Sequence, residues 1–480
     1  MVGIVGVGMI PPISLYIGIG SIVCGIIYIG YILHLINVGR SFWWVVCNVL
    51  FVCMMRGVVE YNWLVEPFNF LPGGSGVLVK LVACVAVVFM ALYVGMFTAI
   101  ASGCVWLVKK RYQYVRDRRF VFVGWFCVMF AFMEWVRSWL FTGFIWNPMV
   151  VMWSWSPVMM SIVSWLSFFS AGILTVYLLG IGYIIYPCIV GTKKWKSVYG
   201  YLIELFIILC LWIGIGVWKV YFVPVKTMGK KVRIIDAKID QSIINNFSYG
   251  RTETIKNFVA GQYAELVRLD GWDDVDLIVL PETSSLCDLT NNEFMEIFYA
   301  NMNNDKSNMI VGFNRYSDID FDSNDFSVYN SIGVLDKYGV HATYDKMHLV
   351  PFGEFVPFRK LLKMAKFTAG GRDFSRGKER NKLIAGGVNL YPLLCYEAIF
   401  ETDVPDGVDA IVTISNDAWF GEWGKVQHLE MAKFRAVEAG VPLIRAANMG
   451  VNDKGAVVID ERGRMVPPFE ELEFVHDFMI

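Results

Sequence analysis

The sequence predicts two domains of different classes: a multi-pass α-helical membrane domain over residues 1–223 and a layered α/β domain over residues 224–480. Hydrophobic residues make up 56% of the 480 residues, which is more than soluble domains usually contain. Charge also divides the chain, since residues 1–223 hold 14 Lys or Arg and 5 Asp or Glu, whereas residues 224–480 hold 28 and 38. From residue 231 onward, short apolar runs alternate with helical patterns, as in α/β domains.

The first half contains six apolar stretches that are long enough, or nearly so, to cross a bilayer as helices. They are residues 13–37, 43–59, 77–108, 120–140, 158–190 and 200–223. Residues 1–11 are also apolar but short, and we interpret them as a clipped first span or a re-entrant segment. No charged segment precedes them, which argues against a cleavable signal peptide.

Basic residues in the connections predict the orientation of these spans. Arg40, six Lys or Arg residues in 109–119, and Lys193, Lys194 and Lys196 lie in alternate connections. The connections between them, 60–75 and 141–157, contain no Lys or Arg. Because cytoplasmic loops carry the positive charge, residues 224–480 are expected on the opposite side, which is the periplasm or exterior in a bacterium.

Charged and aromatic residues within the spans could have either a structural role or a role in binding. Glu134 and Arg137 are three residues apart on a helix, and they form either a structural ion pair or a polar wall for a lipid headgroup. The tryptophans at 135, 139, 146, 153 and 155 are typical of an interfacial aromatic belt, which we favour over a specific binding site.

The second half is predicted to contain strands at 231–236, 277–280, 308–312, 331–335, 389–395 and 410–415, by length and β-branched content. Amphipathic helices are predicted at 252–269 and 427–439. Two of the strands end in reactive side chains, Glu282 and Cys395, and Lys346 lies on a loop between them in sequence. Ligands of such domains gather beyond strand ends.

A thiol, a carboxylate and a cation together suit covalent acyl transfer, although each residue alone has an ordinary structural reading. Cys287 and Cys395 are the two cysteines of residues 224–480, and we expect both to be free thiols. The five histidines show no ligand spacing, so neither a metal nor an organic cofactor is predicted.

The sequence motifs around these residues indicate the function more specifically than the residues alone do. They are Pro281-Glu282, the block 346–357 (Lys-Met-His-Leu-Val-Pro-Phe-Gly-Glu-Phe-Val-Pro), Cys395-Tyr396-Glu397, and the block 415–421 (Ser-Asn-Asp-Ala-Trp-Phe-Gly) followed by Gln427-His428. In this order they resemble the carbon–nitrogen hydrolase (nitrilase) superfamily, and within it the bacterial apolipoprotein N-acyltransferases. In the apolar half, Glu134-Trp135-Val136-Arg137, Thr142-Gly143-Phe144, Trp146 and Pro11-Pro12 are similar to the same family.

The resemblance implies a nitrilase-like αββα sandwich with a Glu282, Lys346 and Cys395 triad. Cys395 would be the nucleophile that forms a thioester, Glu282 the general base, and Lys346 the cation for the oxyanion. Glu354 would assist the base, and Tyr396 and Glu397 would shape the site.

The implied partners are a phospholipid acyl donor, usually phosphatidylethanolamine, and diacylglyceryl-modified apolipoproteins, at the inner membrane with the catalytic domain in the periplasm. No nucleic-acid partner is predicted, and nothing in the sequence demands more than a monomer.

Some features depart from the family or leave alternatives open. Relatives usually continue into a final transmembrane helix, and this sequence ends at Ile480 without one. The loop 358–388 is a candidate lid or an ordinary surface loop. The same triad would also suit a membrane-tethered amidase or an acyltransferase with a different acceptor. A transporter or scaffold with a degenerate second domain is the alternative from another class, and it leaves the intact triad unexplained.

Overall fold

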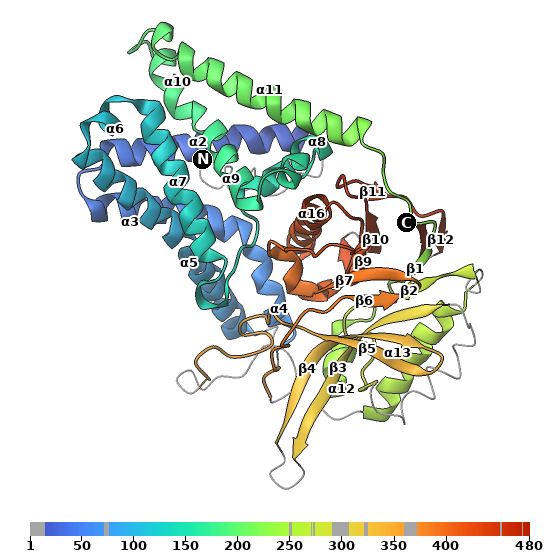
Figure 1. Cartoon of the computed structure of the whole chain (residues 1–480). Coiled ribbons are helices and arrows are strands. Elements are labelled where there is room, and N and C mark those ends of the chain that lie inside the picture. The colour runs from blue at the N-terminus through green and yellow to red at the C-terminus, as the bar shows by residue number, and fades with distance from the viewer. Residues whose placement is uncertain are drawn as a thin grey trace. The chain divides into compact units, whose positions relative to one another are not determined.

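The computed structural model describes residues 15–71, 76–248, 252–269, 271, 274–289, 307–320, 325–359, 372–451, 454–472 and 474–480. The chain forms two compact units, each described here by itself (Figure 1). The first comprises Met1–Val65, Ser75–Pro224 and Val426–Glu438, and the second comprises Glu66–Gly74, Val225–Lys425 and Ala439–Ile480. The change of unit after Pro224 lies at the boundary expected from composition, but the two short exchanged segments were not expected.

The first unit is helical, and six of its described helical segments are long and apolar enough to cross a membrane. They are α2 (Leu15–Val38), α3 (Phe42–Glu60), α5 (Val77–Arg111), α7 (Arg119–Arg137), α9 (Phe168–Leu179) continued by α10 (Ile181–Ile189), and α11 (Tyr199–Phe222). The interpretation of residues 1–11 falls outside the described residues.

One predicted span is too long at its start. Residues expected to begin a span at 158 instead form two short helices, α8 (Pro157–Met160) and η4 (Ser161–Ser164). The long segment begins at Phe168, where the Ser167 side chain accepts a hydrogen bond from the backbone N–H of Ser170. A serine cap interrupts the apolar run at this point, because it satisfies the free N–H groups of a new helix.

The structure confirms the ion pair expected between Glu134 and Arg137 but only part of the expected tryptophan belt. Arg137 Nη2 lies 2.6 Å from Glu134 Oε2, which confirms the ion pair. The tryptophan belt is wrong for Trp146 and Trp153, which are buried. Their indole N–H groups donate to Gln427 Oε1 at 2.6 Å and Thr175 Oγ1 at 2.9 Å, as buried indoles require. Trp135 and Trp139 are exposed.

Helix α16 (Glu422–Ala439) starts five residues before the predicted helix, and most of it belongs to the first unit. The Phe434 ring packs edge-on against Phe168 with centroids 5.5 Å apart, and the Arg435 guanidinium lies over the same Phe168 ring. Gln427 Nε2 also donates to the carbonyl of Glu60 at the end of α3. Both apolar packing and buried hydrogen bonds therefore hold α16 within the helical unit.

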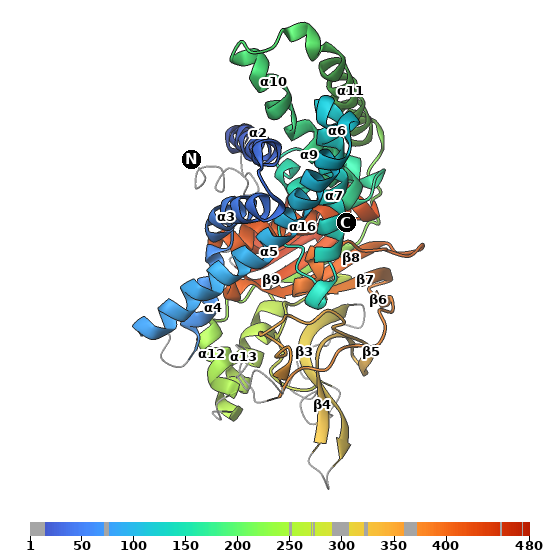
Figure 2. The same cartoon turned by 90° about the vertical axis from the view of Figure 1, so that its left-hand side faces the viewer.

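The second unit contains two β-sheets (Figures 1 and 2). The seven-stranded sheet has the order β12-β13-β1-β2-β3-β4-β5, and the six-stranded sheet has the order β11-β10-β9-β8-β7-β6. The strands are β1 (Lys231–Ile235), β2 (Leu277–Val279), β3 (Asn308–Asp320), β4 (Asp325–Asp336), β5 (Gly339–Asp345), β6 (Leu383–Ala385), β7 (Val388–Leu394), β8 (Ala410–Asn416), β9 (Leu443–Val451), β10 (Lys454–Ile459), β11 (Met465–Val466), β12 (Glu470–Leu472) and β13 (Val475–Met479). In each sheet three successive strands pair in parallel: β1, β2 and β3 in one, and β7, β8 and β9 in the other.

The two sheets share one core. One face of the seven-stranded sheet, including Ile234 and Val279, clusters with Leu394 and Ile414 of the other sheet. The alternate residues Ile235 and Ile278 cluster instead with helix α13 (Thr252–Val267). A period of two thus sends neighbouring side chains to opposite faces of the sheet, which gives a helix layer against two facing sheets. The sequence had predicted β3 and β4 much too short and had missed β5, β6, β9 to β13 and α12 (Gln241–Ser248).

Candidate active site

The three predicted catalytic residues all follow strands. Glu282 lies just beyond β2, Lys346 follows β5 directly, and Cys395 begins the short helix η7 (Cys395–Ile399) directly after β7. Cys395 was predicted as the last residue of a strand, but its φ of 50° places it in the left-handed region instead. Non-glycine residues rarely adopt this conformation, and it often marks functional sites. Here it forms a sharp turn from strand to helix at the thiol.

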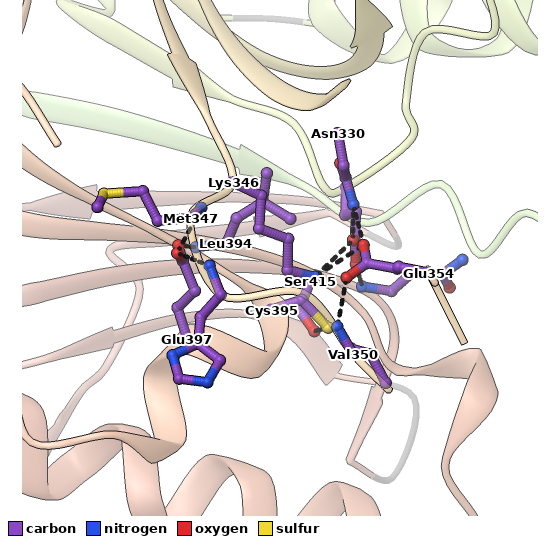
Figure 3. Close-up of polar contacts among 12 residues, drawn as sticks. Asn330, Lys346, Met347, Val350, Glu354, Leu394, Cys395, Glu397 and Ser415 are labelled. Carbon is purple, nitrogen blue, oxygen red and sulfur yellow. Dashed lines mark hydrogen bonds and ion pairs between the residues drawn. The ribbon is translucent and has the colours of Figure 1, made fainter. Parts of the chain in front are cut away.

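Glu282, Lys346 and Glu354 form a buried charged cluster. Lys346 Nζ lies 3.0 Å from Glu354 Oε1 and 3.8 Å from Glu282 Oε1. The side-chain amide of Asn330, on β4, donates to Glu282 Oε1 at 2.7 Å and to Glu354 Oε1 at 2.8 Å. One amide group therefore fixes both carboxylates beside the same ammonium group, and Figure 3 labels Asn330, Lys346 and Glu354 of this cluster.

The remaining carboxylate oxygens accept from the backbone. Glu354 Oε2 accepts from the N–H of Val350 at 2.8 Å, and Glu282 Oε2 accepts from the N–H of Asn416 at 2.8 Å. Asn416 ends β8, so Glu282 is held by the opposite sheet as well as its own. Such an arrangement positions a base before any substrate binds.

The surroundings raise the pKa values of both Lys346 and Cys395. Burial alone would lower the pKa of Lys346, but Glu354 and Glu282 outweigh it, so the pKa is raised and the side chain is an ammonium group at neutral pH. Burial, and then the charge of Glu282, raise the pKa of the Cys395 thiol above its ordinary value, although Lys346 opposes them. The site therefore holds a neutral thiol together with the Glu282 side chain and the Lys346 ammonium group.

Glu397 has a supporting position, because its carboxylate ties the nucleophile turn to the lysine loop. It accepts from the backbone N–H groups of Leu394 at 2.8 Å, Met347 at 3.0 Å and His348 at 3.1 Å. The Tyr344 hydroxyl and Arg380 also donate to it, each at 2.7 Å. One carboxylate thus fixes the two residues that follow Lys346 and the residue that precedes Cys395 (Figure 3 shows Glu397, Met347 and Leu394).

Tyr396 is buried next to the nucleophile and packs in an aromatic group. Its ring meets Phe400 edge-on with centroids 5.2 Å apart, and His348 stacks on Phe400 at 3.8 Å. The ring of Tyr396 therefore supports the wall of the site rather than its charge.

The structure brings all six predicted site residues into one region and adds others that sequence reasoning missed. Four of the missed residues are hydrogen-bonded to the predicted set, and they are Asn330, Ser415, Tyr344 and Arg380. The fifth, Asp417, is linked to it through Ser415. Ser415 and Asp417 lay in a recognised block but had no assigned contact. Asn330 lies one residue before the predicted strand 331–335, so its burial within β4 was not expected. Cys287 and Cys395 are free thiols, as expected. Residues 360–371 of the candidate lid fall outside the described residues.

The close approach of β3 to Glu282 provides a test of its positioning. A Cβ atom at Gly312 would lie 2.7 Å from Glu282 Cα and 2.8 Å from the nitrogen of Thr283, so backbone would have to move. We expect Gly312→Ala to lower turnover by roughly 10²-fold, as a displacement of about 1 Å would. It should also reduce stability by about 1–3 kcal/mol. Turnover and the thermal midpoint would be measured together.

Gly261→Ala is the matched control, because a Cβ atom there meets nothing within 4 Å in helix α13. That change should leave turnover unchanged and stabilise the helix by up to about 1 kcal/mol. Unchanged turnover in Gly312→Ala would contradict the positioning of Glu282 by this contact.

Residues 257–473 match the family model of the carbon–nitrogen hydrolases. Glu282, Lys346 and Cys395 lie within these residues, which are therefore similar in sequence to the carbon–nitrogen hydrolases.

The chain is also similar to apolipoprotein N-acyltransferases. It is 33% identical to that of Allorhizobium ampelinum over 351 residues, which cover 70% of this chain and 63% of the relative. It is 33% identical to that of Sinorhizobium fredii over 359 residues, covering 71% and 63%. It is 29% identical to that of Rickettsia prowazekii over 351 residues, covering 71% and 66%. The chain thus spans less than two thirds of the length of these relatives.

Proposed function

We propose that this protein is an N-acyltransferase of lipoprotein maturation. It would transfer a fatty acyl chain from a phospholipid, through a thioester on Cys395, to the N-terminal amino group of an apolipoprotein's diacylglyceryl cysteine. The similarity to apolipoprotein N-acyltransferases carries this proposal, because a 351-residue match is longer than residues 257–473 and must extend well into the helical half. The buried cluster of Cys395, Glu282 and Lys346 supports it with a suitable chemistry.

The first stage is acylation of the enzyme. Glu282 takes the proton of the Cys395 thiol, and the thiolate attacks the ester carbonyl carbon at the sn-1 position of the phospholipid. The ammonium group of Lys346 stabilises the tetrahedral oxyanion, an effect worth roughly 3–4 kcal/mol for a single preorganised donor. The C–O bond then breaks, and the leaving alkoxide takes the proton back from Glu282 as the lysophospholipid departs.

The second stage is transfer to the amine. The neutral α-amino group of the lipoprotein cysteine attacks the thioester carbonyl, and Glu282 accepts a proton from the attacking nitrogen. The C–S bond breaks, an amide forms, and the thiolate recovers the proton from Glu282. The reaction is therefore a two-stage, ping-pong transfer that needs no cofactor. Glu354 would assist by fixing Lys346 and, through Asn330, Glu282.

We also propose where the reaction occurs. Ten basic residues in alternate connections and none in the connections between them favour a catalytic domain on the periplasmic side of the inner membrane. Both substrates are lipids anchored in a bilayer, and the six apolar helices would keep the site at that surface. Phosphatidylethanolamine is the donor that we propose, and a monomer is sufficient for this chemistry.

A membrane-tethered amidase, or an acyltransferase with another acceptor, would use the same three residues. A transporter or scaffold would need none of them. The substrate that acylates Cys395 therefore distinguishes an acyltransferase, an amidase and a protein without enzymatic activity.

Incubating the purified protein with phosphatidylethanolamine is expected to add the mass of one acyl chain. The added mass should be labile to hydroxylamine, since thioesters are, and absent from Cys395→Ala. Intact mass spectrometry measures both. Adding a diacylglyceryl-cysteine peptide should then discharge the enzyme and increase the peptide mass by the same acyl chain.

The unmodified cysteine Cys287 supplies the control, because Cys287→Ala should load normally. An adduct that persists in Cys395→Ala would contradict the nucleophile assignment. Loading by a simple amide, with none by phospholipid, would favour the amidase.

A further inference from the structure

A chain of buried hydrogen bonds leads away from Cys395 through Ser415 to Asp417. The Ser415 hydroxyl is placed to donate either to Cys395 Sγ at 3.3 Å or to Asp417 Oδ1 at 2.7 Å. Arg445, on β9, pairs with the other oxygen of Asp417. Ser415, Asp417 and Arg445 are at most 1% exposed, so water does not compete for these contacts (Figure 3 shows the Ser415 and Cys395 end).

The Ser415 hydroxyl has one hydrogen and two neighbours that can accept it. A hydrogen bond to an ionised carboxylate is charge-assisted and about twice as strong as one between neutral groups. A thiol sulfur is a weak acceptor. While Cys395 is a thiol, the hydrogen therefore belongs to Asp417, and the oxygen of Ser415 presents a lone pair to the S–H group.

The same geometry disfavours the thiolate. A thiolate needs donors, but the Ser415 hydroxyl can donate to sulfur only by leaving Asp417. If it stays, its lone pair faces a negative charge. The Ser415 hydroxyl therefore stabilises the thiolate only when Asp417 releases it.

We propose that Asp417 is a positioning residue that holds Ser415 as a hydrogen-bond acceptor, and thereby keeps Cys395 a thiol until Glu282 removes its proton. This inference rests on the proposed function, since it takes Cys395 as the nucleophile. Its benefit is chemical, because a thiol resists oxidation and stray alkylation far better than a thiolate does.

Other charges also act on Cys395 and must be held constant in a test. Glu282 follows β2, Lys346 follows β5, and Asp417 follows β8, and each acts directly on the thiol. Glu354 acts behind Lys346, and Glu397 lies on the thiol's own helix. Removing Asp417 alone would also leave the Arg445 charge buried without its ion pair.

The test therefore replaces the ion pair as a unit, with Asp417→Asn and Arg445→Gln together. Local net charge is unchanged, and replacing both partners of a buried pair is usually tolerated. Iodoacetamide alkylation of the Cys395 peptide would be followed by mass spectrometry across pH. We expect the apparent pKa of alkylation to fall by roughly one pH unit, the value of one charge-assisted hydrogen bond.

The effect must act through Ser415. In a Ser415→Ala background, the paired change should lower the alkylation pKa by less than it does when Ser415 is present, because only the direct effect of the Asp417 charge then remains. Ser415→Ala alone should lower the pKa by less than the pair does, because it removes an acceptor for the thiol. This single change removes only a hydroxyl and remains informative if the paired variant does not fold.

Arg233→Gln with Asp477→Asn is the matched control, since this is a second buried Arg–Asp pair in the same unit. It joins β1 to β13, and its removal should leave the alkylation pKa unchanged. An unchanged or raised pKa in the Asp417 and Arg445 variant would overturn the inference. So would an equal fall with and without Ser415, or a rise in Ser415→Ala.

Alkylation needs neither phospholipid nor lipoprotein, so this result is separate from the proposed function. A protein that shows the expected shifts but never carries an acyl chain would contradict the acyltransferase alone. One that loads normally but shows no shift would contradict the role of Asp417 alone.

Discussion

Replacing Glu282 with Gln is expected to lower acyl transfer by about 10²–10⁴-fold, the usual contribution of a positioned general base. The same change should make the Cys395 thiol easier to ionise, because it removes a negative charge that raises the pKa of this thiol. Transfer and alkylation should thus move in opposite directions. Turnover with phosphatidylethanolamine and the pH profile of iodoacetamide alkylation measure the two effects on the same variant.

The neutral side chain also disturbs local hydrogen bonds. The carboxylate of Glu282 accepts from Asn330 on one oxygen and from the N–H of Asn416 on the other. The amide that replaces this carboxylate would have one carbonyl oxygen for two donors, so one donor is left without its acceptor at a cost of about 1–3 kcal/mol. A thermal midpoint is therefore needed to show that the variant remains folded.

Glu354→Gln is the matched control, because it removes the same charge from the other side of Lys346. We expect a loss of roughly 10-fold, within the range of a group that only orients a general base. If Glu354→Gln and Glu282→Gln lose equal activity, the base cannot be assigned to Glu282. If Glu282→Gln retains activity, the proposed proton transfers are wrong.

Replacing Glu397 with Ala is expected to destabilise the second unit by about 3–5 kcal/mol, as removal of one member of a buried, hydrogen-bonded ion pair does. Glu397 is 2% exposed and pairs with Arg380. Its loss also deprives three backbone N–H groups of their acceptor, at Leu394, Met347 and His348. Because these groups flank Cys395 and Lys346, activity should fall even at temperatures where the variant is folded.

Unfolding by urea, followed with turnover at low temperature, measures both effects. Glu401→Ala is the control, since Glu401 is an exposed acid four residues farther along the chain. That variant should match the unaltered protein within about 0.5 kcal/mol, as surface changes usually do. Normal stability of Glu397→Ala would show that Arg380 and the backbone donors find other partners.

Membrane-type helices were the most predictable part of the fold, because long apolar runs have few alternative structures. The first residues of the fifth run were wrong, since a short helix ends at Ser164 and Ser167 caps the start of the next one. The predicted tryptophan belt was also wrong for Trp146 and Trp153, which are buried. Composition shows an amphipathic side chain, but its hydrogen-bond partner depends on tertiary structure.

Strands of the second half were predicted where they are short, parallel and apolar, as in β2, β7 and β8. The polar halves of β3 and β4 were missed, because pairing with each other rather than burial maintains them. The residues of the site likewise divide into those that the sequence predicted and those that it did not. Sequence motifs identified the residues at strand ends. Asn330 and Asp417, in contrast, act through contacts that no local pattern encodes.

The segments exchanged between the two units limit how the protein can be divided and how it unfolds. The chain passes from one unit to the other five times, at residues 65, 74, 224, 425 and 438. A fragment starting at Val225 would carry Phe434 and Arg435 of α16, which are fully or almost fully buried, without the Phe168 ring against which both pack. Such a fragment should aggregate, although its boundary looks natural in the sequence. The intact protein should melt in a single cooperative step, because neither unit can lose its structure without disturbing chain segments that belong to the other.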